Sequence, residues 1–262
     1  MALGGLRASL LAGAALLITA APAFAADLGV SMKDAPAAAD SWTATGYIQG
    51  TNDYIFRGQS QTRRDPAVQG GADIGYGWFY AGTFLSNVDF KFPDGAVHDA
   101  RAEFDIYAGI KPKVGDVTLD IGVITYNYAW NKTIPGTTFD PDYQEIKAGA
   151  SVTVLKDLTL GGTFFWSPDY FGQSGQTITV EGTASKPIAK IQDVEFAASG
   201  TIGHISFARD SNLDYTYGNL GLTATYKSIS IDARWWDTDI KGGCPGVYQC
   251  SSAFAGTLKY SF

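Results

Sequence analysis

The sequence predicts an all-β protein, a transmembrane antiparallel up-and-down β-barrel of about 12 strands with short periplasmic turns and long extracellular loops. Three observations predict it. Apolar and polar residues alternate within many segments, long and short connections alternate along the chain, and the last predicted strand ends in an aromatic residue. Strict long/short alternation is typical of outer-membrane barrels, and it requires an even number of strands with both ends of the chain on the same side.

The composition argues against several other classes of protein. The chain of 262 residues is 45% hydrophobic, 13% aromatic and only 17% charged, whereas disordered segments are rich in charge and poor in aromatic residues. The net charge of −7 argues against a nucleic-acid-binding protein. The 2 histidines leave little material for His-based metal sites or acid–base chemistry. We therefore expect no cofactor, no metal site and no nucleic-acid partner.

The N-terminus predicts export. Arg7 precedes an apolar stretch from Leu10 to Ala21, and Ala23-Phe24-Ala25 supplies an A-x-A cleavage site. Residues 1–25 are therefore expected to be a secretory signal peptide, and residues 26–41 a flexible leader. Beyond them, no window approaches the roughly 18 consecutive apolar residues of a transmembrane helix. Two locations remain, a soluble one outside the cytoplasm and the outer membrane of a Gram-negative bacterium.

The barrel is expected to occupy residues 42–262. Segments rich in Val, Ile, Thr, Tyr, Phe and Gly are separated by turn residues, which predicts strands. Long connections follow the odd-numbered strands and short turns the even-numbered ones, and 185–191 is the least regular short turn. The predicted strands are 42–55, 66–76, 78–86, 100–111, 114–127, 143–154, 158–167, 175–184, 192–207, 215–226, 229–237 and 253–262.

Each predicted strand has one apolar face and one polar or small face. In 100–110, for example, Arg101, Glu103 and Asp105 alternate with Ala, Phe and Ile. A soluble barrel would bury the apolar face inside and a membrane barrel would turn it outward, so the alternation leaves both open. Aromatic residues near strand ends favour the membrane barrel, whose girdles lie at both interfaces, although aromatic residues suit strands in general. These residues are Tyr76, Trp78, Phe79, Tyr80, Tyr126, Tyr128, Trp130, Phe164, Phe165, Trp166, Tyr170, Trp235 and Trp236.

The C-terminus carries a further membrane signal. Leu258, Tyr260 and Phe262 occupy alternate positions up to the end of the chain, which is similar to the last strand that the outer-membrane assembly machinery reads. A closed barrel is needed in lipid because an open sheet edge leaves backbone groups without hydrogen bonds. The expected partners are outer-membrane lipid, the assembly machinery through the C-terminal strand, and small polar solutes.

If the polar faces line the lumen, acidic residues outnumber basic ones there, and charges in a narrow wall set selectivity. The expected function is a porin-like channel for passive diffusion of small hydrophilic solutes, with a mild preference for cations or neutral solutes. The alternative is a closed barrel with a structural, adhesive or envelope-integrity role. The expected lumen residues are Asp53, Asp73, Glu103, Asp105, Asp120, Glu145, Glu181, Glu195 and Asp232, with Arg57, Arg101, Lys147, Arg234 and Lys259 as the bases.

The end of the first predicted strand combines charge with aromatic residues. We expect Tyr54 and Phe56 to face lipid, and Asp53 and Arg57 to face inward. Asp53 and Arg57 would then lie about 13 Å apart on one face, and they are expected to pair with neighbouring strands, either to fix the strand register or to set selectivity. Gly58 is expected to supply a bulge or a positive φ at the rim.

Two further residue pairs could take part in chemistry. Cys244 and Cys250 lie in the last long loop, and in an exported protein they are expected to form a structural disulfide. An esterase would need Ser206 within hydrogen-bond reach of His204, which a sequence cannot establish. No catalytic motif occurs, so the protein is not expected to be an enzyme and no catalytic residue is assigned.

Residues 51–90 resemble the start of the TorF family of porin-like proteobacterial outer-membrane proteins. The segment contains D-Y-x-F-R-G-x-S-Q-T from Asp53, P-A-x-Q-G-G from Pro66 and Y-A-G-x-x-x-S-N-V-D-F from Tyr80. Residues 103–109 and 143–149 are similar to later blocks of that family. The resemblance implies a β-barrel in the outer membrane and suggests a pore. It implies no particular solute and no catalytic residues.

Overall fold

The computed structural model describes residues 41–90, 100–129, 140–240 and 250–262. The predicted signal peptide and nearly all of the leader lie outside these residues. The long strands are β1 (Trp42–Thr51), β4 (Ala67–Tyr76), β5 (Phe79–Asn87), β6 (Ala102–Ile110), β8 (Val117–Ala129), β9 (Tyr143–Val154), β10 (Leu158–Tyr170), β11 (Gly175–Ile191), β12 (Val194–Phe207), β13 (Tyr215–Tyr226), β14 (Ile229–Thr238) and β15 (Ala253–Ser261). The connections contain β2 (Ile55–Phe56), β3 (Gln59–Ser60), β7 (Lys113–Val114) and the 3-10 turns η2 (Phe171–Gln173) and η3 (Ser211–Leu213).

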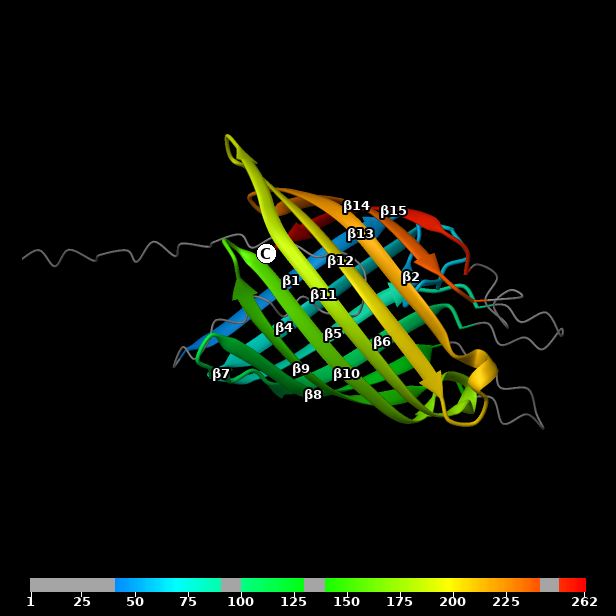
Figure 1. Ribbon diagram of the computed structural model, residues 1–262. Helices are drawn as coiled ribbons and strands as arrows, with labels where there is room; N and C mark the ends of the chain where they lie inside the picture. The colour runs from blue at the N-terminus through cyan, green and yellow to red at the C-terminus, as the bar shows by residue number, and fades with distance from the viewer. Residues whose placement is uncertain (1–40, 91–99, 130–139, 241–249) are drawn as a thin grey trace, which may run out of the picture.

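The twelve long strands form one closed antiparallel barrel (Figure 1). Each strand pairs with the next long strand along the chain, and β15 pairs with β1 from Tyr47↔Ser261 to Thr51↔Thr257. Closure gives every strand two hydrogen-bonded neighbours, so the wall has no open edge. The predicted fold class is confirmed.

The two ends of the barrel differ. The start of β1, the end of β15 and the two-residue turns, such as Lys227-Ser228, lie at one end, which we call the turn end. The longer connections lie at the other end, which we call the loop end (Figure 1). Within the residues that the structure describes, no helix is long and apolar enough to cross a membrane.

Most strand boundaries lie close to the predicted ones, but two predictions were wrong. The predicted turn 185–191 belongs to β11, whose pairing with β12 continues to Ile191↔Val194. Pairing between β10 and β11 stops at Thr159↔Ser185, so Pro187 lies where β11 has only one neighbour, the position that a proline tolerates. The first strand ends at Thr51 instead of residue 55, because the chain leaves the wall there.

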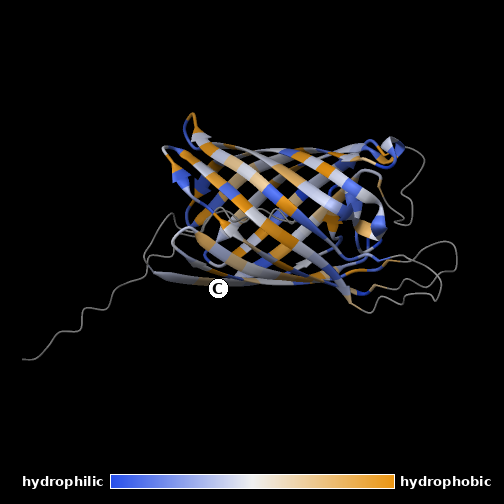
Figure 2. Cartoon of the chain, turned by 90° about the horizontal axis from the view of Figure 1, so that it is seen from below, coloured by the Kyte–Doolittle hydropathy of each residue, from blue (hydrophilic) through white to orange (hydrophobic). Residues whose placement is uncertain are grey.

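The apolar face of the wall points outward. On β13, Leu220 and Leu222 are 67% and 57% exposed, whereas Asn219 and Thr223 on the opposite face are 5% and 2% exposed. Orange and blue therefore alternate along the strands in Figure 2. A water-soluble barrel would have the reverse distribution, since apolar side chains gain free energy by leaving water.

Whether an aromatic residue faces outward or inward depends on its odd or even position along the strand, which we call its parity. Those on the outside lie near the turn end (Trp42, Tyr76, Trp78, Phe79, Tyr226, Tyr260 and Phe262), toward the loop end (Trp235 and Phe254) or, for Phe164, in the middle of β10. The expectation of an outer girdle was wrong for Tyr80, Tyr126, Tyr128, Phe165 and Trp236, which are buried inside the barrel. The period of two along a strand selects the face, whatever the distance from the strand end. Trp130 lies outside the described residues.

Candidate functional site: an inward hairpin in a charged lumen

The connection between β1 and β4 folds into the barrel as a hairpin, which we call the inward hairpin (residues 53–62). Its two short strands, β2 and β3, are joined by Arg57 and Gly58, whose φ values are +48° and +78°. Two successive positive φ values are those of a type I′ turn. A methyl group added to Gly58 would lie 2.9 Å from Cβ of Tyr217 on β13 and 3.2 Å from Cβ of Thr238. The hairpin tip therefore rests against β13 and β14, and the positive φ expected at Gly58 is confirmed.

Arg57 at the tip forms a buried ion pair with the wall. Its Nη1 and Nη2 donate to the two carboxylate oxygens of Glu145 on β9 at 2.7 and 2.8 Å, and its Nε lies 4.0 Å from Glu181 on β11. The guanidinium carbon is 4.9 Å from the ring centres of both Phe56 and Phe165. Two-pronged arginine–carboxylate pairs are strong and fix geometry, so this contact fastens the tip across the lumen.

The base of the hairpin is fixed by hydrogen bonds around Asp53. Ser60 Oγ and Thr62 Oγ1 donate to Asp53 Oδ1 at 2.5 and 3.3 Å, and the Tyr54 N–H donates to Thr62 Oγ1 at 3.1 Å. Burial raises the pKa of the Asp53 carboxyl, while these hydrogen bonds and the charge of Arg64 oppose the shift. Thus the two ends of the hairpin are joined side by side at the rim.

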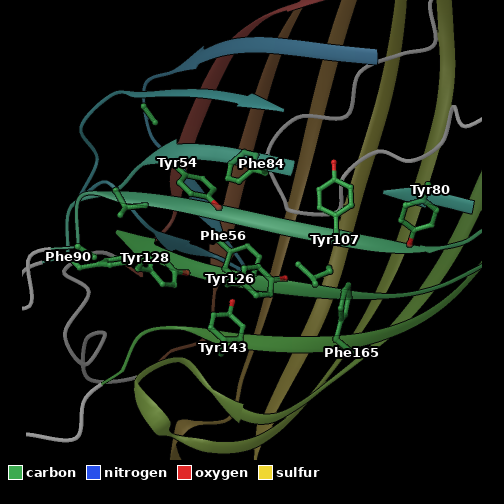
Figure 3. Close-up of a cluster of buried hydrophobic side chains, with 14 residues drawn as sticks. Tyr54, Phe56, Tyr80, Phe84, Phe90, Tyr107, Tyr126, Tyr128, Tyr143 and Phe165 are labelled. Carbon is green, nitrogen blue, oxygen red and sulfur yellow. The ribbon is translucent and has the colours of Figure 1, made fainter. Parts of the chain in front are cut away.

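Aromatic side chains hold the hairpin against the inner wall. Tyr54 lies 5.8 Å from Phe84, and Phe56 lies 5.9 Å from Tyr126, between ring centres (Figure 3). The expectation that Tyr54 and Phe56 face lipid was wrong, since they are 1% and 7% exposed inside the barrel. The alternation of a wall strand no longer applies after Thr51, because the chain turns inward there.

A second set of inner charges surrounds Asp120 on β8. Tyr80 Oη donates to Asp120 Oδ1 at 2.7 Å, and Lys147 Nζ donates to Oδ2 at 2.9 Å. Lys111 Nζ lies 3.8 Å from the same carboxylate. The sequence analysis did not assign Lys111 to the lumen, because Lys111 lies just after the end of β6, beside a turn. It nevertheless continues the series of odd-numbered, inward-facing residues of that strand.

Several other inner charges are also paired with neighbours. Arg234 on β14 donates to Asp232 Oδ2 at 3.1 Å, to Asn219 Oδ1 at 2.6 Å and to Ser199 Oγ at 2.9 Å. Tyr107 Oη donates to Asp73 Oδ1 at 2.7 Å. Lys259 Nζ lies 4.1 Å from the ring centre of Tyr47. Glu181 accepts a short hydrogen bond from Tyr217.

Glu103 and Asp105 on β6 form an acidic pair beneath the inward hairpin. They are 1% and 0% exposed, and Tyr128 Oη donates to Glu103 Oε1 at 3.3 Å. Within the described residues, Glu103 Oε2 and both oxygens of Asp105 accept no hydrogen bond. Tyr126 and Tyr128 beside this pair were assigned by sequence to an outer girdle, and their positions along β8 are the signal that would have placed them inside.

Two predicted lumen residues lie elsewhere. Glu195 has inward parity, but it lies near the tip of the β11–β12 hairpin, which extends beyond β10, and there it is exposed and bonds Lys190 at 2.8 Å. Arg101 precedes β6 and is exposed. Parity alone does not reveal how far a hairpin extends beyond the neighbouring strands, which explains the error at Glu195, or where a strand begins, which explains the error at Arg101.

The other predicted positions are placed as follows. Leu258, Tyr260 and Phe262 point outward and are at least half exposed, and the Phe262 N–H donates to Gly46 O at 2.9 Å. Cys250 is buried at the loop end, but Cys244 lies outside the described residues, so the disulfide stays a prediction. His204 lies exposed on the outer face, with its Nδ1 3.1 Å from Thr216 Oγ1. Across the described ranges, no three His, Cys, Asp or Glu side chains gather as metal ligands.

Comparisons with known proteins agree with this architecture. A family model described as "Bacterial protein of unknown function (Gcw_chp)" matches residues 35–261. The solved structure titled "KdgM porin" has a TM-score of 0.54 at 8% identity and covers 84% of this chain and 99% of that chain. KdgM porin in complex with disordered oligogalacturonate has a TM-score of 0.53, with the same identity and coverage.

A NanC porin structure has a TM-score of 0.51 at 15% identity and covers 83% of this chain and 98% of that one. At these identities the similarity establishes the fold alone. The comparison with curated proteins found no match.

Proposed function

The chain belongs to the Gcw_chp family of bacterial proteins, and on this premise we propose that it is a porin-like channel of the outer membrane. It would pass small hydrophilic solutes by passive diffusion, with a mild preference for cations or neutral solutes. One observation carries the proposal, namely that the closed barrel turns its apolar rows outward and its charges inward. The TorF resemblance lies within the matched residues and supports the same reading.

The proposed orientation puts the turn end in the periplasm and the loop end outside the cell. Short periplasmic turns and long extracellular loops are the rule for such barrels. The exposed aromatic residues at the turn end would then lie at the periplasmic interface of the outer membrane. The exposed C-terminal side chains, Tyr260 and Phe262, are proposed to be read by the assembly machinery before β15 closes against β1.

A charge placed on the outer face tests the membrane location. Leu220, near the middle of β13, is 67% exposed. The variant Leu220→Arg is expected to lower the free energy of unfolding in lipid vesicles by about 2–4 kcal/mol, because the arginine would face hydrocarbon. The control is Gln192→Arg, in the exposed turn between β11 and β12. Denaturant titration measures both, and equal stability of the two variants would contradict a lipid-facing Leu220.

The preference for cations follows from the inner charges. Among the described residues, the inward acids Asp53, Asp73, Glu103, Asp105, Asp120, Glu145, Glu181 and Asp232 outnumber the inward bases Arg57, Lys111, Lys147, Arg234 and Lys259. A negative lumen attracts cations and repels anions. One similar porin, KdgM, was solved in complex with oligogalacturonate, a polyanion. The surplus of acids in the lumen of this chain favours positively charged solutes instead.

Planar bilayers test the channel directly. The purified protein is expected to give discrete conductance steps in KCl, and the reversal potential across a KCl gradient is expected to indicate K⁺ over Cl⁻. A matched bilayer receiving detergent alone is the control. A reversal potential of the opposite sign would refute the cation preference, and the absence of steps would refute an open channel.

A closed barrel is the second candidate, and the inward hairpin favours it. Arg57, Glu145 and Glu103 are each 1% exposed although they lie inside the barrel, so the lumen is filled at that level. A wild-type protein that does not conduct, together with a hairpin-deleted protein that does, would support this candidate.

A further inference from the structure

The acidic pair Glu103–Asp105 differs from the other inner charges. The two residues are two apart on β6, so their side chains share the inward face. The ion pairs inside the described barrel involve Arg57, Lys111, Lys147 and Arg234, and they include neither Glu103 nor Asp105. Two buried carboxylates are therefore left without a basic side chain of their own among the residues that the structure describes.

The pair also lacks hydrogen-bond donors. Three of its four carboxylate oxygens have no hydrogen-bond partner within the described residues. The backbone N–H of Asn127 and the hydroxyl of Tyr54 are directed toward the pair, but neither reaches hydrogen-bond geometry. Burying an unpaired carboxylate is costly, so the pair is suited to a positively charged partner that the described residues do not supply.

In the described part of the chain, the groups around the pair supply no such charge. A further carboxylate that acts on Asp105 is that of Glu145, which is paired with Arg57. The titratable groups that act on the pair from β1, β6, β8 and the inward hairpin are all tyrosines, which are neutral near pH 7. These are Tyr47, Tyr54, Tyr107, Tyr126 and Tyr128.

Aromatic rings enclose the same place. Phe84 on β5 and Tyr126 on β8 are the cross-strand neighbours of Asp105, and Tyr128 is the neighbour of Glu103. Tyr54 packs on Phe84 from the hairpin side (Figure 3). Ring faces attract cations, most of all organic ammonium groups.

We propose that Glu103 and Asp105 bind the ammonium group of a small amine as it passes through the barrel. An R–NH₃⁺ group has three N–H donors, which matches the three free oxygens, and its carbon chain suits the aromatic surroundings. A divalent metal fits less well, because no three metal-ligating side chains gather in the described part of the chain. This proposal names small amines as solutes of the channel proposed above, and their transport depends on that channel being open.

Binding is tested apart from conduction, with the whole protein folded in detergent micelles. Ethylammonium chloride is expected to raise the unfolding temperature, because a ligand of the folded state stabilises it. Tetramethylammonium chloride, which is charged but has no N–H donor, and sodium and potassium chloride are the comparison salts at equal concentration. An equal effect of all four salts would overturn the ammonium site, and so would no effect of any.

Isosteric variants assign the effect to the pair. Asp105→Asn and Glu103→Gln are each expected to weaken ethylammonium binding about tenfold or more, since each removes a charge-assisted hydrogen bond. Both variants remove a buried charge and are expected to fold. The control is Glu195→Gln, outside the lumen, which is expected to bind as wild type. Unchanged binding in both pair variants would overturn the proposal.

Bilayer recordings separate this proposal from the channel. Ethylammonium is expected to permeate more readily than tetramethylammonium in wild type, and the difference is expected to shrink in Asp105→Asn. Binding without conduction would leave the site standing and refute the channel. Conduction without binding would leave the channel standing and refute the site.

Discussion

Removing the inward hairpin is expected to raise the single-channel conductance severalfold. The hairpin crosses the lumen from β1 and β4 to β9, β11 and β13, where Arg57 bonds Glu145 and Gly58 rests on Tyr217. Conductance through a barrel depends on its free cross-section and on the groups that line it. Deleting a segment that fills the lumen therefore widens its narrowest cross-section.

The deletion is feasible because the two ends of the hairpin already touch. Thr62 Oγ1 lies 3.3 Å from Asp53 Oδ1, so residues 54–61 can be replaced by two glycines. Pairing between β1 and β4 ends at Thr51↔Ala67 and is not disturbed. The control deletes residues 209–213, an exposed loop at the same end. Equal conductance of the hairpin-deleted protein and the wild type would show that the hairpin is not the constriction.

Replacing Arg57 by alanine is expected to detach the hairpin tip. Removing one partner of a buried ion pair costs about 3–5 kcal/mol, because the other charge stays buried without compensation. Here Glu145 loses both hydrogen bonds from the guanidinium, and the nearby Glu181 loses its closest basic group. The docked hairpin is thereby destabilised, and the conductance of Arg57→Ala is expected to rise toward that of the deletion.

Arg64→Ala is the matched control for this experiment. Arg64 lies in the same connection, but it is exposed and donates to Ser251 Oγ at 2.5 Å on the rim. Its removal is expected to leave the conductance unchanged. Glu145→Gln, which keeps the shape of the Arg57 partner, is expected to show an intermediate effect. Identical recordings from Arg57→Ala and Arg64→Ala would contradict the role of the buried pair.

Much of the wall could be predicted from the sequence because strand signals are local. The period of two and the turn residues located the twelve strands, and the long/short alternation of connections placed both chain ends together. These features depend on residues close together in the chain. The errors occur where local rules stop applying. One is at Thr51, where the chain leaves the wall. The other is at Pro187, in the part of β11 that extends beyond its pairing with β10.

The candidate site could be predicted only in part. Parity correctly placed Glu103, Asp105 and Glu145 on the inner face. It could not reveal that Tyr54 and Phe56 turn inward with the hairpin. Nor could it show that tyrosines surround the acidic pair, because the register between strands decides which rings face it.

The sequence by itself determined a barrel of about twelve strands, each with one apolar and one polar face, since alternation and turn spacing are properties of neighbouring residues. The tertiary structure showed that the apolar faces point outward. Only the tertiary structure decided what fills the lumen. Arg57 and Glu145 are 88 residues apart in the chain, and no periodic pattern connects them. Their contact exists because the barrel closes and brings opposite walls within reach of one folded-in connection.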